Sequence, residues 1–279
     1  MNIGCHVSID DDIFRAPERA KKLGCECFQI FSRSPHGGKS KELTKDVVAK
    51  FQKELRKARI QNVYIHTPYF INFASLNNRI RYGSISVVRE DLERGSILGA
   101  KYVMTHLGSA GELSEKEATE KVIAMLTKML DGYTGQTKLL IENAAGAGRI
   151  IGATFSQIKK IITKVNHRAL VGVCLDTQHS FASGYDFHTP AVAKKTFAKI
   201  EKELGKNMIK MMHANDSKVE FNSRRDRHEH IGKGHIGKEG FAEIVSYAQR
   251  NDSDMVLETE HDFVESDIRI LKKLRDEKK

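Results

Sequence analysis

Short apolar runs alternate with longer amphipathic stretches along the whole chain, and this alternation predicts eight strand–helix units. The apolar runs are typical of buried parallel strands, which are hydrophobic on both faces. The predicted strands cover residues 2–7, 27–31, 63–65, 102–105, 138–141, 171–176, 208–212 and 255–257. The predicted helices cover residues 11–23, 44–58, 84–98, 114–130, 155–165, 190–204, 238–249 and 266–274.

Simple alternation of strands and helices is compatible with an open doubly wound sheet or with a closed barrel. Eight units in about 270 residues favour an α/β fold of the (β/α)8 TIM-barrel type, which typically needs ~250 residues. A glycine-rich dinucleotide fingerprint does not follow the first strand, which argues against a dinucleotide-binding sheet. Because no proline- or serine-rich linker interrupts the pattern, we predict one domain, residues 1–279, with its functional face formed by the βα loops.

The charge balance favours an anionic partner. The chain has 46 Lys and Arg against 36 Asp and Glu, a formal net charge of +10. Such a balance is typical of proteins that bind nucleic acid, and it is equally compatible with a basic soluble surface. The charge alone therefore leaves both interpretations open.

The four cysteines lie in or beside apolar runs and lack the paired spacing of a zinc finger. They are typical of reduced thiols in the core of an intracellular protein. The amino-terminal residues lack the basic and apolar regions of a signal peptide, and no apolar run approaches the ~20 residues that span a membrane. We therefore expect a cytoplasmic protein without membrane attachment.

Six successive predicted strands end in a side chain that can bind a metal ion, at intervals of 40, 36, 34, 37 and 45 residues. A single His or Asp at a strand end usually makes a structural hydrogen bond. In a barrel, however, the carboxyl ends of all strands converge on one mouth, so the six side chains would face one another. Burying such a cluster is unfavourable unless cations balance it. The six residues are His66, His106, Glu142, Asp176, His213 and Glu258.

Three further residues extend this cluster. His179 follows Asp176 by three residues, and Asp226 and His228 lie two residues apart in a long polar loop, residues 214–236. Side chains two apart on an extended segment point to the same side. Nitrogen and oxygen donors without thiolate suit zinc, with manganese or iron as alternatives at one site. At three or four ligands per ion, these nine residues predict two or three metal ions.

A cluster of divalent ions suits phosphate-ester hydrolysis, because it binds phosphate oxygens, supplies hydroxide near neutral pH and stabilises the leaving oxygen. Tyr69 and Phe70, in the loop after the third strand, would stack against or wedge into a duplex, although Phe70 fits packing within the loop better. Basic residues on the βα loops would bind backbone phosphates, with a solvated surface charge as the alternative for each. They are Arg33, Lys39, Lys41, Arg79, Arg81, Lys218, Arg224, Arg225 and Arg227.

These residues fall in segments that resemble the endonuclease IV family, the metal-dependent apurinic/apyrimidinic (AP) endonucleases. The resemblance runs nearly end to end, and all nine metal-ligand positions of the family hold matching residues. The matching segments are GCHVS at 4–8, LIEN at 140–143, VGVCLDTQH at 171–179, GYD at 184–186, HANDSK at 213–218, DRHEHIGKG at 226–234 and LET at 257–259.

The resemblance implies a site of three zinc ions and a reaction. The implied ligand sets are His66, His106 and Glu142; Asp176, His213 and Glu258, with Glu142 as a bridge; and His179, Asp226 and His228. The implied reaction hydrolyses the DNA phosphodiester 5′ to an abasic site and leaves a 3′-hydroxyl and a 5′-deoxyribose phosphate. The family also clears blocked 3′ ends. Glu142 and Glu258 resemble the carboxylates that position or activate the attacking water.

The resemblance also implies how DNA is bound. Tyr69 resembles the family's side chain that enters the bent duplex at the lesion, and the implied partner is double-stranded DNA with an abasic sugar flipped out. We expect a monomer associated with the nucleoid. One loop departs from the family, because His36 holds the position of an Arg that commonly inserts through the base stack. Arg33 or Lys39 would have to take its place. The expected DNA contacts are Tyr69, Arg33, Lys39, Lys218, Arg224, Arg225 and Arg227.

Two other functions are compatible with parts of this pattern. A sugar isomerase or epimerase on the same barrel would use one or two divalent ions, and Asp176, His179 and Glu258 would serve it as well. The third ligand set and the basic loops argue against that enzyme. A non-catalytic lesion-binding protein would keep the basic surface without the chemistry, and the complete ligand set argues against it.

Overall fold

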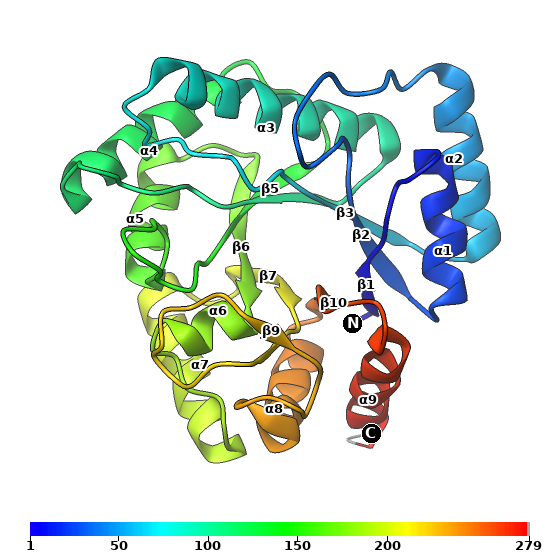
Figure 1. Cartoon of the computed structure of the whole chain (residues 1–279), viewed down its shortest axis with the longest axis vertical. Helices are drawn as coiled ribbons and strands as arrows, with labels where there is room; N and C mark the ends of the chain where they lie inside the picture. The colour runs from blue at the N-terminus through cyan, green and yellow to red at the C-terminus, as the bar shows by residue number, and fades with distance from the viewer. Residues whose placement is uncertain (278–279) are drawn as a thin grey trace.

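A closed barrel of eight parallel strands, surrounded by helices, forms the body of the protein (Figure 1). The computed structural model describes residues 1–277. The closed barrel confirms the predicted (β/α)8 TIM-barrel fold. The last two residues of the predicted domain, 278–279, lie outside the described residues.

The barrel strands follow one another around the barrel in chain order, and the last strand pairs with the first. β10 pairs with β1 through Met255 and Ile3, and with β7 through Val256 and His213. Two short strands, β8 (Asp216–Ser217) and β9 (His228–Glu229), pair antiparallel within the loop after β7. The barrel strands are β1 (Ile3–His6), β2 (Cys27–Phe31), β3 (Asn62–His66), β4 (Tyr102–Thr105), β5 (Lys138–Glu142), β6 (Leu170–Asp176), β7 (Ile209–His213) and β10 (Asp254–Leu257).

The helices cover the outside of the barrel. Two of them begin at side-chain caps: Thr44 Oγ1 accepts the Val47 N–H at 3.3 Å, and Ser114 forms a capping box with Glu117. Within residues 1–277, no helix is both long and apolar enough to cross a membrane. The helices are the 3-10 turn η1 (Ile13–Arg15), α1 (Ala16–Lys22), α2 (Lys45–Ala58), α3 (Asn78–Leu98), α4 (Glu115–Leu130), α5 (Phe155–Val165), α6 (Thr177–Ala182), α7 (Pro190–Leu204), α8 (Gly237–Arg250) and α9 (Val264–Asp276).

The predicted helix 11–23 is shorter in the structure, a 3-10 turn followed by α1 over Ala16–Lys22. Two further differences are explained by side-chain caps. α3 begins at Asn78 rather than at residue 84, because the Asn77 side chain accepts the N–H groups of Arg79 and Ile80. The short helix α6 was not predicted. The Asp176 carboxylate begins it by accepting the His179 N–H at 2.7 Å. Asp176, which the sequence predicts as a metal ligand, therefore also caps a helix.

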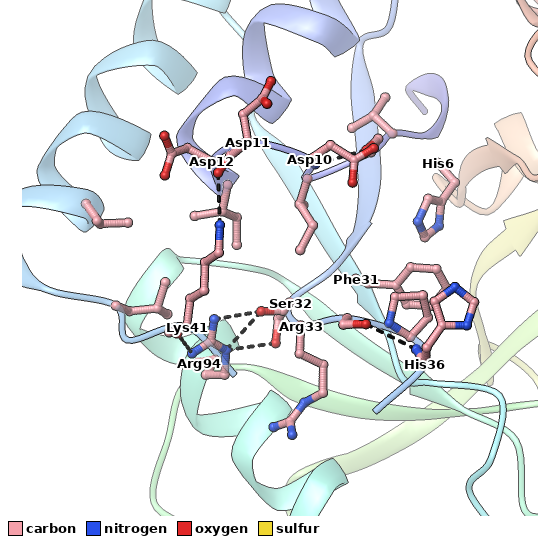
Figure 2. A pocket seen from close by; sticks show the side chains of 18 of the residues that line it. His6, Asp10, Asp11, Asp12, Phe31, Ser32, Arg33, His36, Lys41 and Arg94 are labelled. Atoms are coloured by element: carbon pink, nitrogen blue, oxygen red, sulfur yellow. Dashed lines mark hydrogen bonds between the residues drawn. The ribbon is translucent and has the colours of Figure 1, made fainter. Parts of the chain in front are cut away.

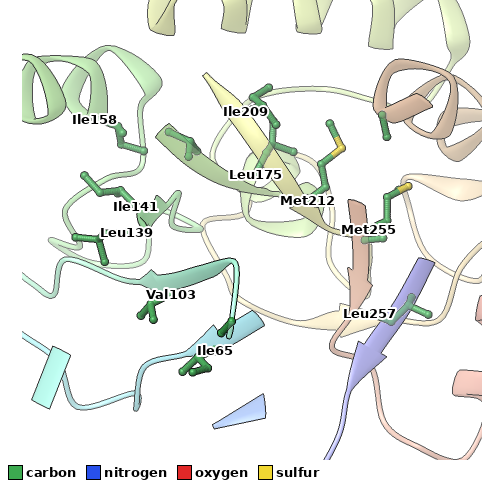
Figure 3. Packing of buried hydrophobic residues seen from close by; sticks show 14 of the residues in the cluster. Ile65, Val103, Leu139, Ile141, Ile158, Leu175, Ile209, Met212, Met255 and Leu257 are labelled. Carbon is green, nitrogen blue, oxygen red and sulfur yellow. The ribbon is translucent and has the colours of Figure 1, made fainter. Parts of the chain in front are cut away.

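Two separate layers of side chains fill the fold. Outward-facing strand residues, among them Ile65, Val103 and Leu139, pack in the layer between barrel and helices (Figure 3). The barrel interior holds its own cluster of Cys27, Tyr64, Met104, Leu140, Cys174, Met211 and Val256. At the corresponding position β1 has Gly4, where a Cβ atom would lie 1.7 Å from the Cys27 carbonyl oxygen. This interior cluster forms a solid floor beneath the mouth of the barrel.

Candidate metal centre

A ring of polar side chains lines the mouth of the barrel directly above this floor. Alternate residues of a strand face the same side, so each ring position lies two residues after a floor position. The ring contains the six predicted strand-end residues and two residues that were not predicted from the sequence, His6 and Gln29. In chain order the ring is His6, Gln29, His66, His106, Glu142, Asp176, His213 and Glu258.

Three groups of possible ligand atoms form within and beside this ring, and the atoms of each group lie within 4.8 Å of one another. Glu142 and Asp176 each belong to two groups, so neighbouring groups share a carboxylate. The first two groups contain the first two predicted ligand sets. The groups are His66, His106 and Glu142; Glu142, Asp176, His213 and Glu258; and Asp176, His179 and His228.

Glu142 lies at the centre of the cluster and is only 1% exposed. Its Oε2 atom is 2.8 Å from His66 Nε2 and 3.6 Å from His106 Nε2. Its Oε1 atom is 3.0 Å from His213 Nδ1 and 3.3 Å from His179 Nδ1. One buried carboxylate thus contacts four imidazoles, three from the ends of β3, β4 and β7 and one, His179, from α6.

The predicted third set is also brought together, at the outer edge of the cluster. Asp226 Oδ2 is 3.2 Å from His179 Nε2, and Asp226 Oδ1 is 3.3 Å from His228 Nε2. Asp176 Oδ2 lies 3.7 Å from His228 Nε2, so this buried carboxylate adds to the set. The Asp226 side chain is 57% exposed, which leaves this part of the cluster open to solvent.

The loop that carries Asp226 and His228 is fixed on both sides. The buried amide of Gln178 donates from Nε2 to the Arg225 carbonyl oxygen at 2.9 Å, next to Asp226. The pairing of β8 with β9 places His228 opposite Ser217. The first anchor joins the loop to α6, which also carries His179, and the second joins the middle of the loop to its start directly after β7, so the segment holds Asp226 and His228 at defined positions.

The Asp216 carboxylate holds the second half of the same loop. The residue is fully buried, and its side chain accepts five backbone N–H groups. The donors and distances are Ser217 (2.8 Å), Gly232 (2.9 Å), Gly234 (3.1 Å), Ile236 (2.9 Å) and Gly237 (3.2 Å). At Gly234 a Cβ atom would lie 2.5 Å from the Ser217 carbonyl oxygen, so the loop packs too closely for a side chain.

We expect Asp216→Asn to lower the free energy of unfolding by at least about 2 kcal/mol, because an amide nitrogen cannot accept the N–H groups that one carboxylate oxygen now accepts. Urea unfolding followed by circular dichroism measures the change. Asp131→Asn, at an exposed position, is the matched control. An Asp216→Asn midpoint equal to that of the control would contradict this role.

The imidazoles are oriented as metal ligands require. His66 Nδ1 donates to the Thr67 carbonyl oxygen at 2.6 Å, which leaves Nε2 as the acceptor atom facing the cluster. Within residues 1–277, three buried ring nitrogens make no hydrogen bond of good geometry, although Asp226 lies within 3.3 Å of the last two: His106 Nδ1, His179 Nε2 and His228 Nε2. Buried polar atoms are normally satisfied, and a divalent cation would satisfy the inward-facing nitrogens here. The donor set of imidazoles and carboxylates fits zinc.

The electrostatics of the cluster favour ionised carboxylates. Burial alone would raise the pKa of Glu142, but His106 and His213 hold it well below its usual range. Burial likewise opposes ionisation of Glu258, yet the nearby His213 lowers its pKa to about 2. Burial would lower the pKa of His179, whereas Asp176 raises it well above the ordinary value. The carboxylates therefore attract positive charge, which divalent ions supply in exchange for protons.

Amide side chains around the ring were not predicted as functional residues. Asn215 Nδ2 donates to Asp176 Oδ2 at 2.7 Å, and Asn215 Oδ1 accepts the Glu258 N–H at 2.9 Å. Asn143 Oδ1 accepts the Asp176 N–H at 2.8 Å. Gln29 contacts three ring members. The sequence signal for Gln29 was a polar residue inside the otherwise apolar run of β2. Because alternate residues of a strand face the barrel interior, this side chain points into the ring.

Tyr69 stands at the edge of a cavity of about 370 Å³ that the ring lines. Its side chain is 69% exposed, and its ring packs edge-on against Phe31 with 5.4 Å between the centroids. Five predicted DNA contacts on the βα loops are also exposed: Lys39, Lys218, Arg224, Arg225 and Arg227. Exposed cations therefore lie on loops after β2 and β7, at the same end of the barrel as the cavity.

Arg33 is not exposed, and the expectation that it contacts DNA needs correction. Its side chain is 5% exposed, with Nε 3.1 Å from Asp91 Oδ1 and Nη2 2.7 Å from Glu90 Oε2. Arg94 donates to the Ser32 carbonyl oxygen beside it (Figure 2). These buried contacts bind the loop after β2 to α3, so Arg33 holds the loop instead of reaching the solvent. His36 and Lys39 remain exposed on that loop.

Proteins of similar sequence match the entire chain. The model of the xylose isomerase-like TIM barrel family matches residues 17–274. A probable endonuclease 4 from Cenarchaeum symbiosum is 37% identical over 99% of this chain and 99% of that protein. The chain belongs to the endonuclease IV family. Another member, a probable endonuclease 4 from Aquifex aeolicus, is 39% identical over 87% of this chain and 86% of that protein.

Solved structures of the endonuclease IV family have the same barrel. Endonuclease IV from Thermus thermophilus superposes with a TM-score of 0.85 at 25% identity, covering 99% of this chain and 100% of that one. A D-tagatose 3-epimerase-like protein superposes with a TM-score of 0.75 at 20% identity, covering 100% of this chain and 99% of that one. The second likeness concerns the fold alone, and it shows that the barrel also occurs in proteins named as sugar epimerases.

Proposed function

We propose that the protein is a zinc-dependent AP endonuclease that hydrolyses the DNA phosphodiester 5′ to an abasic site. The products would be a 3′-hydroxyl and a 5′-deoxyribose phosphate. The observation that carries this proposal is the third ligand group at the cavity edge, because a mononuclear or dinuclear sugar enzyme does not need it. Membership of the endonuclease IV family supports the same reaction.

The nine residues would hold three zinc ions in three sets, with manganese or iron as an alternative at one site. Glu142 would bridge the first two ions, since its two oxygen atoms face different imidazole pairs. The 3.7 Å between Asp176 Oδ2 and His228 Nε2 supports a contribution of Asp176 to the third set as well. The sets are His66, His106 and Glu142; Asp176, His213 and Glu258; and His179, Asp226 and His228.

Bound zinc would supply Lewis-acid stabilisation of the phosphate and an acidified water molecule. The two glutamates differ in access to that chemistry. Both line the cavity, but the Glu142 side chain is 1% exposed among four imidazoles, whereas the Glu258 side chain is 18% exposed. Glu258 therefore fits the carboxylate that orients the attacking water and accepts its proton, and Glu142 fits a bridging ligand.

DNA would lie across the carboxyl ends of the strands. Lys39, Lys218, Arg224, Arg225 and Arg227 would bind backbone phosphates, which positions the duplex without reading its sequence. Tyr69 would occupy the space left by the missing base.

The same site could clear blocked 3′ ends, because a 3′-terminal phosphate ester presents the same bond to the same ligands. We further propose that the protein acts as a monomer on chromosomal DNA in the cytoplasm.

A duplex oligonucleotide with one tetrahydrofuran abasic analogue tests the function. We expect zinc-dependent incision directly 5′ to the analogue, loss of incision after chelation, and recovery when zinc is added back. An intact duplex of the same sequence is the control. Isomerisation of ketoses without incision would favour the sugar epimerase that shares this barrel. Binding to the analogue without incision would favour a non-catalytic lesion-binding protein.

We expect Tyr69→Ala to reduce the preference for abasic over intact duplex about 10-fold, because it removes one ring–base stack of roughly 1–3 kcal/mol. Overall affinity for intact DNA should change less, since the cations provide most of it. Fluorescence anisotropy with both duplexes at one salt concentration measures the ratio. Tyr69→Phe should keep the preference. An unchanged ratio in Tyr69→Ala would assign the ring to packing against Phe31.

A further inference from the structure

The amide of Gln29 joins three members of the ring. Gln29 is fully buried in β2. Its Nε2 atom lies 2.7 Å from Glu258 Oε1 and 3.0 Å from His6 Nδ1. Its Oε1 atom lies 2.8 Å from His213 Nε2. A single uncharged side chain thus contacts two proposed zinc ligands and one ring residue, His6, that has no role in the proposed mechanism.

These contacts fix where the protons lie. An ionised carboxylate only accepts hydrogen bonds, so the N–H side of the amide must face Glu258. The second amide N–H then donates to His6 Nδ1, which leaves the ring proton of His6 on Nε2. The amide oxygen accepts from His213 Nε2, so Nδ1 is the His213 nitrogen that would offer its lone pair to a bound metal ion. That atom faces Glu142 at 3.0 Å and Glu258 at 3.2 Å, as a metal ligand should.

His6 lies where two cavities meet. It lines the 370 Å³ cavity above the ring and also the neighbouring cavity of about 620 Å³ between the loops after β1 and β2 (Figure 2). Its ring packs against Phe31, with 4.5 Å between the centroids. Among residues 1–277, no hydrogen-bond partner is found for His6 Nε2. A neutral N–H donor of fixed tautomer is therefore available to a molecule in the cavity.

We propose that Gln29 is a positioning residue that maintains this order of hydrogen bonds, and that His6 donates from Nε2 to an oxygen atom of the bound DNA. The second part rests on the proposed function. A neutral donor can bind a phosphate or sugar oxygen at the rim without competing for the metal ions. Gln29 links this contact to the metal ligands, because displacement of its amide would disturb Glu258, His213 and His6 together.

Four variants test the proposal on the zinc-loaded protein: His6→Phe, Gln29→Met, the double variant and the control Gln61→Met. Gln61 is exposed just before β3, at the opposite end of the barrel from the cavity. We expect His6→Phe to lower kcat/KM for abasic incision roughly 10- to 100-fold, with zinc content unchanged, because it removes a donor to a charged acceptor. Gln29→Met should lose a similar factor. The double variant should lose less than the product of both factors, since the two residues act through one chain of hydrogen bonds.

Nitrogen-15 NMR of histidine-labelled, zinc-loaded protein reads the tautomers directly. We expect the His6 proton on Nε2 in the wild type and in Gln61→Met, and a mixture of tautomers in Gln29→Met. A His6 proton on Nδ1 in the wild type would overturn the role of Gln29. Wild-type kcat/KM in His6→Phe would overturn the contact with DNA. A protein that never incises would refute the proposed function and with it that contact, while the tautomers would still decide the role of Gln29.

Discussion

Glu258→Gln is expected to lower kcat for incision by about 10²- to 10⁴-fold, the usual contribution of a positioned acid–base group. The amide keeps the size of the side chain and can still accept the Gln29 N–H through its oxygen. It cannot accept a proton from water, and it is a weaker metal ligand than a carboxylate. Affinity for abasic DNA should change little, because the phosphate-binding cations lie on other loops.

Two measurements distinguish loss of the chemical step from loss of DNA binding. Single-turnover incision gives the chemical step, and anisotropy with uncleaved duplex in calcium gives the affinity. Glu260→Gln, two residues further along at an exposed position, is the matched control and should incise as the wild type does. Turnover of Glu258→Gln within a factor of two of this control would contradict the assigned role.

Glu142→Gln is expected to remove most of the bound metal and abolish measurable incision. Its carboxylate contacts His66 at 2.8 Å and His213 at 3.0 Å, and it belongs to two of the three ligand groups. Neutralising it leaves the first group with only two strong ligands and takes one ligand from the second. We expect zinc content to fall from three ions to one or none per chain.

Elemental analysis after dialysis against zinc-free buffer measures this loss, and circular dichroism checks that the barrel remains folded. Glu112→Gln is the control, because Glu112 is exposed on the loop after β4 at the same end of the barrel. Retention of three ions by Glu142→Gln would show that the central carboxylate is not a shared ligand. The proposed bridge between the first two ions would then be wrong.

The barrel and the convergence of the six strand-end residues could be predicted because both depend on regular spacing. Each unit of strand and helix brings the chain back to the same mouth, so residues such as His66 and Glu258 converge although almost two hundred residues separate them. The ring members His6 and Gln29 escaped prediction for a different reason. His6 lies inside the predicted strand 2–7 and Gln29 inside the predicted strand 27–31, so neither stood at a predicted strand end, and an amide is not among the usual zinc ligands.

Local contacts set the limits of the sequence prediction elsewhere. Arg33 is a basic residue on a βα loop, as a DNA contact would be. Only its ion pair with Asp91 on α3, far away in the sequence, shows that its side chain is buried. The start of α3 depended on the Asn77 cap, and α6 depended on the cap from Asp176. Such caps resemble ordinary loop residues until the backbone direction is known. The polar loop of residues 214–236 was predicted as irregular, yet β8, β9 and the Asp216 carboxylate give it a fixed shape.

The closure of the barrel by β10 between β1 and β7 has a consequence during translation. Glu258 follows the final strand, so a nascent chain on the ribosome lacks one of its proposed catalytic carboxylates until nearly all residues have been made. Before then β1 and β7 each expose an unpaired edge, and the barrel cannot close. Prematurely terminated fragments would therefore carry the basic loops without a complete site for hydrolysis. Under the proposed function, such fragments would lack the site that cuts DNA.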